Sequence, residues 1–84
     1  MPDYILSAHA EAVLMQRSIR LEWLERVLNN PQRTELDQHD THLTHALGNI
    51  AENGNRVLRV VYNQNAQLIT VVTVYFDRTM RNKL

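Results

Sequence analysis

Two β-rich runs flanking a short polar break dominate the second half of the chain. Residues 56–62 read RVLRVVY, residues 63–66 read NQNA, and residues 67–76 read QLITVVTVYF. Two runs rich in β-branched and aromatic residues are typical of a β-hairpin. The second run is apolar at both odd and even positions, which is typical of a strand inside a sheet, covered on both faces. We therefore expect residues 67–76 to form the central strand of a sheet.

Two helices are expected before this sheet. Ser7 is a suitable N-cap for a helix over residues 8–17, since its hydroxyl can accept a hydrogen bond from a first-turn amide. A second helix is expected over residues 20–29, where leucines recur on one face and Asn-Asn-Pro follows. Short edge strands are expected over residues 4–6 and 34–36, and a longer strand over residues 41–50.

The turn before the first β-rich run predicts a strand register. Asn53 and Gly54 are typical of the centre of a two-residue type I′ turn, which needs two successive positive φ angles. The resulting pairs are Ile50 with Val57, Gly48 with Arg59, Ala46 with Val61, and His45 with Tyr62. In this register Leu47, Leu58 and Val60 lie on the face expected to pack under the helices. Gly48 would leave room for the Arg59 side chain or for a backbone approaching the sheet.

Together these elements predict one α+β domain over residues 1–84, with two N-terminal helices on a three- to four-stranded antiparallel sheet. The chain has no cysteine, which fits a reducing compartment and excludes disulfides and thiolate metal sites. It lacks an apolar run long enough to span a membrane, and its first residues do not resemble a signal peptide. We expect a cytoplasmic protein without membrane contact.

The formal net charge is zero, but the charge is unevenly distributed. Residues 1–40 contain four arginines and seven acidic residues, whereas residues 41–84 contain five basic and two acidic residues. The basic part could meet phosphate groups, or the two parts could pair with each other in the fold.

His39, His42 and His45 are spaced by three residues, which raises the question of a metal site. In a strand, side chains three residues apart point to opposite faces, and zinc needs three or four converging ligands. We therefore predict no bound metal and no cofactor.

Three other positions are candidate functional residues. His9 lies in the first turn of an apolar helix, where it could act as a general acid or base, or hold the helix in place through a backbone hydrogen bond. Arg59 lies mid-strand between apolar residues, so its guanidinium must reach a phosphate, a carboxylate or water, with Glu11, Glu22 and Glu25 as candidate partners. Tyr75 shares a strand face with Thr73, and Tyr62 is expected across from them, so three hydroxyls could order a ligand.

Several segments read together resemble a known family. They are ILSAHA at residues 5–10, MQRSI at 15–19, EWLERVLNNP at 22–31, LRVVY at 58–62 and ITVVTVY at 69–75. This combination resembles a small bacterial domain family of unknown function with a Ser-x-His-Ala opening, a Gln-Arg-Gly-Ile segment and a Thr-Val-Tyr strand. That family is similar to the RelE/ParE-type toxins, whose members cleave RNA or act on a gyrase partner and are neutralised by an antitoxin.

The resemblance implies a metal-independent ribonuclease of a bacterial toxin–antitoxin system. His9 would be the base, Arg17 or Arg59 would hold the phosphate from the sheet side, and Tyr75 would be the acid. Two positions depart from the family pattern: Val13 stands where an arginine often occurs, and Ser18 stands where the family has glycine. The alternative is a non-catalytic protein-interaction domain. RNA, an antitoxin and a second copy of the chain are the partners left open.

Overall fold

The computed structural model describes residues 3–65 and 68–84. Its helices and strands are β1 (Asp3–Leu6), α1 (Ala8–Gln16), α2 (Leu21–Asn29), β2 (Arg33–Leu36), β3 (Leu43–Ile50), β4 (Arg56–Asn65) and β5 (Leu68–Phe76). Two short 3₁₀ helices, η1 (Ala51–Asn53) and η2 (Arg78–Met80), follow β3 and β5. The break expected over residues 63–66 is wrong for residues 63–65, which belong to β4, and residue 66 lies outside the described residues.

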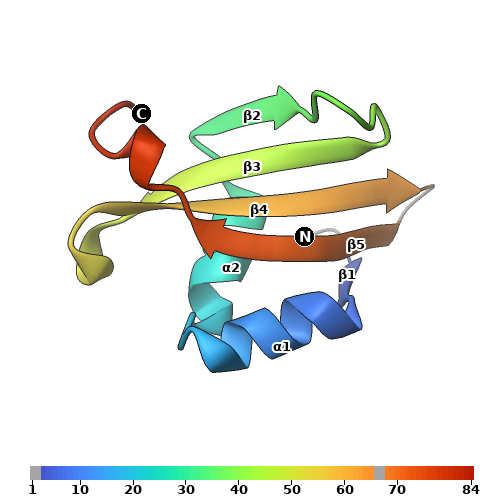
Figure 1. Ribbon diagram of the computed structural model, residues 1–84, viewed down its shortest axis with the longest axis horizontal. Helices are drawn as coiled ribbons and strands as arrows, with labels where there is room; N and C mark the ends of the chain where they lie inside the picture. The colour runs from blue at the N-terminus through green and yellow to red at the C-terminus, as the bar shows by residue number, and fades with distance from the viewer. Residues whose placement is uncertain (1–2, 66–67) are drawn as a thin grey trace.

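The α+β class is confirmed, but the sheet is larger than expected and mixed. Its strand order is β1-β5-β4-β3-β2, and β1 runs parallel to β5 while the other pairs are antiparallel. The prediction of three or four antiparallel strands is therefore wrong in strand number and direction. The centre of the sheet is β4, and β5 lies between β4 and β1 (Figure 1).

Both helices lie on one side of the sheet (Figure 1). Ser7 caps α1 as expected, accepting a hydrogen bond from the Ala10 amide at 3.0 Å. Its hydroxyl also donates to the Val72 carbonyl at 2.9 Å, which ties the start of α1 to β5. The main core forms between the helices and the sheet, and its fully buried members include Leu24, Leu58, Val60, Val71 and Val74.

The register of β3 against β4 differs by one residue from the predicted one. Positive φ angles do occur at two successive residues, but these are Gly54 (φ 66°) and Asn55 (φ 59°). Asn53 belongs to η1, so the connection is longer than a two-residue turn. Gly48 consequently pairs with Leu58, and Leu47 pairs with Arg59.

A one-residue shift moves side chains to the other face of a sheet. Leu58 and Val60 pack under the helices as predicted, but Leu47 lies on the opposite face with Arg59. The residue facing Gly48 across the core is Val27 of α2, so neither the Arg59 side chain nor a backbone fills that place. The expected row of three hydroxyls is also absent among the described residues, because Tyr62 pairs with Val71 and packs against the helix-side core.

A β-bulge explains why β5 is apolar at odd and even positions. Val61 pairs with Thr73 and Tyr62 with Val71, so Val72 is an extra residue on β5. The bulge changes which positions point toward the helices: Val71 is buried on that side before it, and Val74 after it. β5 is therefore apolar at both odd and even positions because the alternation of its side chains shifts by one residue at the bulge, and not because the strand is covered on both faces.

The face of the sheet without helices, called here the helix-free face, buries a second, smaller set of side chains. Leu47 and Val57 are almost fully buried there, and Val61 and Arg59 are largely buried. The final residues of the chain lie beside Val57, where Asn82 and Leu84 line a shallow hollow. No helix within residues 3–65 and 68–84 is long and apolar enough to span a membrane.

Candidate functional site on the helix-free face

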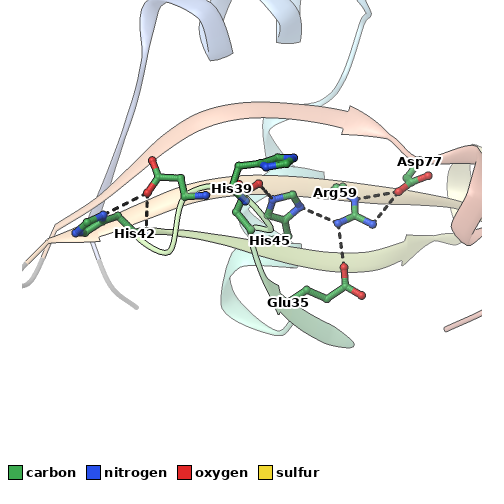
Figure 2. Close-up of polar contacts among 8 residues, drawn as sticks. Glu35, His39, His42, His45, Arg59 and Asp77 are labelled. Carbon is green, nitrogen blue, oxygen red and sulfur yellow. Dashed lines mark hydrogen bonds and ion pairs between the residues drawn. The ribbon is translucent and has the colours of Figure 1, made fainter.

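Arg59 is the centre of a polar network on the helix-free face (Figure 2). Its Nε and Nη2 donate to Asp77 Oδ2 at 2.9 and 2.8 Å. Its Nη1 donates to Glu35 Oε1 at 3.1 Å and to His45 Nδ1 at 2.7 Å. These partners come from β2, β3 and the residue after β5, so the network exists only when the sheet has formed.

The contacts of His45 define its tautomer. A guanidinium can only donate hydrogen bonds, so Nδ1 of His45 must be an unprotonated acceptor beside Arg59. The proton of the neutral ring then resides on Nε2, which donates to Asp37 Oδ1 at 2.7 Å. The other oxygen of Asp37 accepts the His39 and Asp40 amides, each at 3.0 Å, which fixes the carboxylate. The imidazole is therefore oriented from both sides.

The charged groups of the network stabilise one another in their ionised forms. Burial alone would lower the pKa of Arg59, but hydrogen bonds to Asp77 and Glu35 outweigh it and raise that pKa. The hydrogen bond with His45, aided by two backbone amides, lowers the pKa of Asp37. The Thr79 hydroxyl and Arg59 lower the pKa of Asp77 against the opposing effect of burial.

A hollow of about 440 Å³ gives access to this network. Its lining residues are Glu35, Leu36, Asp37, Gln38, His39, His45 and Arg59. The side chains of His45 and Arg59 are only 14% and 11% exposed, so a small part of each reaches the hollow. A proton acceptor and a cation are thus held side by side, and a proton accepted at Nδ1 would give an imidazolium that Asp37 stabilises.

The structure brings together only two of the four residues predicted for a site. Tyr75 is the cross-strand partner of Arg59, and both lie on the helix-free face. His9 and Arg17 are exposed residues of α1 and of its C-terminal cap, on the helix side of the sheet. A single site that combines His9 with Arg59 is therefore not assembled, because the sheet lies between them.

The predicted carboxylate partners of Arg59 were also wrong. Glu11, Glu22 and Glu25 all lie on the helices, on the other side of the sheet. Glu35, Asp37, His45 and Asp77 were missed as site residues, although the need of a mid-strand arginine for carboxylates was a usable signal. His45 was missed because the predicted register, one residue away from the observed one, placed this histidine and Arg59 on opposite faces of the sheet.

The three clustered histidines lie in two different settings. Strand β3 begins at Leu43, so His39 and His42 belong to the preceding loop, and only His45 obeys the strand alternation. His42 contacts Asp40 through its ring and its amide, at 3.2 and 2.9 Å. Within the described parts of the chain, no three histidine or carboxylate side chains converge as a metal site would require.

Comparison with protein families places the chain in one of them. The sequence profile of the DUF4258 family, described as a domain of unknown function, matches residues 6–76. The chain belongs to the DUF4258 family. No curated protein and no solved structure gave a match. The DUF4258 match extends from the end of β1 to the end of β5 and contains every residue of the Arg59 network except Asp77.

Proposed function

We propose that this DUF4258 protein is a toxin-like domain that cleaves RNA by metal-independent general acid–base chemistry on the helix-free face. The observation that carries the proposal is the direct contact of Arg59 with His45 in one hollow. A guanidinium suits a phosphodiester, and an imidazole oriented by a carboxylate suits proton abstraction. The base is thus His45 in place of His9, while Arg59 and Tyr75 keep the roles expected from the family resemblance.

The proposed reaction balances within the chain's own groups. His45 Nδ1 takes the proton of a ribose 2′-hydroxyl, and the 2′-oxygen attacks the adjacent phosphorus. The bond from phosphorus to the 5′-oxygen breaks, and the Tyr75 hydroxyl gives its proton to that oxygen. The products are a 2′,3′-cyclic phosphate and a 5′-hydroxyl, while Arg59 stabilises the charge that develops on the phosphoryl oxygens.

Substrate binding requires Arg59 to exchange one of its present partners for the phosphate. Glu35 is the more easily displaced carboxylate, since its side chain is 31% exposed against 13% for Asp77. Arg33 Nη2 already holds the other oxygen of Glu35 at 3.0 Å, so the displaced carboxylate keeps a cationic partner. Movement of the guanidinium onto phosphate would also free His45 Nδ1 to accept a proton.

The biological setting that we propose is a toxin–antitoxin pair. Support comes from the resemblance to RelE/ParE-type toxins and from the α+β architecture, in which helices cover one sheet face only. An antitoxin that covers the hollow beside His45 would block the substrate. This proposal places RNA and one protein partner on the same face of the molecule.

The test is RNA cleavage by purified protein in the presence of a chelator, with growth arrest on expression as a second readout. We expect wild-type protein to leave 2′,3′-cyclic phosphate ends and His45→Asn to lose about 10²–10⁴-fold in rate, the usual contribution of a general base. Asparagine retains a polar group near Arg59, so we expect the cleavage rate to fall strongly while the thermal midpoint changes little. His42→Gln is the matched control, because His42 is 82% exposed in the neighbouring loop.

Two results would contradict this assignment. Wild-type protein that neither cleaves RNA nor arrests growth would exclude the ribonuclease function. Cleavage that survives His45→Asn and disappears with His9→Ala would return the chemistry to α1.

A protein-interaction domain without catalysis is the second candidate, and the edge strand β2 favours it. On its outer side β2 pairs with no strand of the described residues, and its Leu36 is 70% exposed. An exposed strand edge can accept an added strand from another protein. Growth arrest that persists in His45→Asn and is lost in Leu36→Glu would support this function over RNA cleavage.

A further inference from the structure

Three arginines without carboxylate partners meet at the end of the sheet where β4 begins and β5 ends. Arg56, Arg78 and Arg81 are exposed and form no ion pair with any residue in the ranges 3–65 and 68–84. All three line one hollow of about 280 Å³, together with Phe76 and Asp77. Arg20, Arg26, Arg33 and Arg59 each contact a carboxylate, whereas the remaining arginine, Arg17 on the helix side, also forms no ion pair within the described residues.

The acidic residue at this hollow is already occupied. Asp77 Oδ2 accepts from Arg59, and Oδ1 accepts from the Thr79 amide and hydroxyl at 3.0 and 2.6 Å. The negative charge of Asp77 is therefore already bound to Arg59 and to the donors of Thr79 in η2. Three cations gathered around one small space repel one another, so an anion bound there would be favoured electrostatically.

The hollow also has fixed walls. Arg81 Nη2 donates to the Gly54 carbonyl at 3.2 Å, which orients its guanidinium. Phe76 adds an aromatic surface, and its ring makes an edge-to-face contact with Trp23 at a centroid distance of 6.1 Å. Arginine donors beside an aromatic ring suit a phosphate joined to a sugar and a base.

We infer that the hollow formed by Arg56, Arg78, Arg81 and Phe76 binds a nucleotide unit of single-stranded RNA. The arginines hold the phosphate, and Phe76 contacts the base or ribose. This inference rests on the proposed ribonuclease function and adds a flanking substrate subsite to it. Asp77 links the two sites, since it lines this hollow and binds Arg59 with its side chain, whereas Phe76 before it packs toward the helix side.

The test is binding of a fluorescent, uncleavable 2′-O-methyl RNA octamer, measured by anisotropy over a range of salt concentrations. A protein with Arg56→Gln, Arg78→Gln and Arg81→Gln should bind at least tenfold more weakly. Each phosphate neutralised on a single strand contributes about 0.7 to the slope of log affinity against log salt, and the three arginines hold one phosphate, so the slope should fall by about 0.7. Arg81→Gln alone should weaken binding by less than the triple variant does and lower the slope by less than about 0.7.

Arg20→Gln is the matched control, since it removes the same charge from an exposed residue of the helix side that pairs with Glu22. Equal losses for Arg20→Gln and Arg81→Gln would show a non-specific charge effect and overturn the assignment. Binding of AMP as tight as that of the octamer would overturn the choice of RNA. Thermal midpoints within a few degrees of wild type show that the variants are folded.

The outcomes separate this subsite from the catalytic proposal. Octamer binding that depends on the three arginines supports the subsite even if wild-type protein cleaves no RNA, and in that case only the catalytic proposal fails. Cleavage by the triple variant with wild-type affinity would overturn the subsite and leave the chemistry at His45 in place.

Discussion

Gly48 shows how a single residue fixes the distance between a helix and the sheet. A Cβ atom added at Gly48 would lie 2.8 Å from Val27 Cγ2, which is closer than real Cβ contacts allow. Val27 is 2% exposed and belongs to α2, so it has little freedom to move away. The absence of a side chain at Gly48 therefore lets α2 pack closely over β3.

We predict that Gly48→Ala lowers the free energy of unfolding by about 1–3 kcal/mol, the usual cost of overpacking a core. In a Val27→Ala background the same substitution should cost clearly less, because the atom that it meets is gone. Chemical denaturation of the four proteins in this double-mutant cycle gives the coupling. Equal costs in both backgrounds would show that Val27 does not determine the effect.

The connection between α1 and α2 is decided by the way α1 ends. The Ile19 amide bonds the Leu14 carbonyl at 3.0 Å and the Ser18 amide bonds the Met15 carbonyl at 3.4 Å, which together form a Schellman motif. Ser18 occupies its left-handed position with φ 54°. This conformation favours glycine, the residue that the family resemblance places here, and it directs Ile19 into the core.

We predict that Ser18→Gly raises the free energy of unfolding by about 1 kcal/mol, because serine carries a steric cost at positive φ that glycine lacks. Gln16→Gly, inside the last turn of α1, is the opposite control and should lower it by up to about 1 kcal/mol. Urea unfolding of both variants measures the two changes. A loss of stability in Ser18→Gly would show that the serine side chain contributes more than its backbone strain costs.

Over the whole molecule, the uneven charge distribution has two outcomes. The Arg59–Glu35 pair joins a base of the basic part to an acid of the acidic part, as expected if the two parts pair in the fold, whereas Arg26–Glu52 joins the two parts with the opposite charges. Arg26 holds Glu52 with two hydrogen bonds, of 2.9 and 2.6 Å, and lowers the pKa of Glu52 to about 2. The three arginines at the hollow beside Phe76, which form no ion pair among the described residues, leave a basic surface there.

These pairs predict that stability falls in acid. A carboxylate whose folded pKa lies below its unfolded value stabilises the protein above the unfolded pKa, and this contribution is lost as the pH falls toward the folded pKa. For Glu52 the window runs from about 4.5 down to about 2. We expect the thermal midpoint of Glu52→Gln to lie below that of wild type at pH 6 and to equal that of wild type near pH 2. A constant difference in thermal midpoint across this range would contradict the assignment.

The sequence by itself determined the features that depend on neighbouring residues. The cap at Ser7, the helix that ends at Asn29, the edge strand β2 and the two C-terminal strands all follow from local propensities and periodicity. The need of Arg59 for charged partners also followed, since a guanidinium between apolar strand residues must be paired.

Tertiary structure alone decided which residues meet. Sequence signals gave two successive positive φ angles near Gly54 but not which two residues adopt them, and a shift of one residue reverses every side chain of β3 relative to β4. The parallel pairing of β1 with β5 and the bulge at Val72 likewise depend on contacts between segments far apart in the chain. The site with His45 beside Arg59 is a product of that register, because long-range pairing minimises the free energy of the whole sheet and no local preference specifies it.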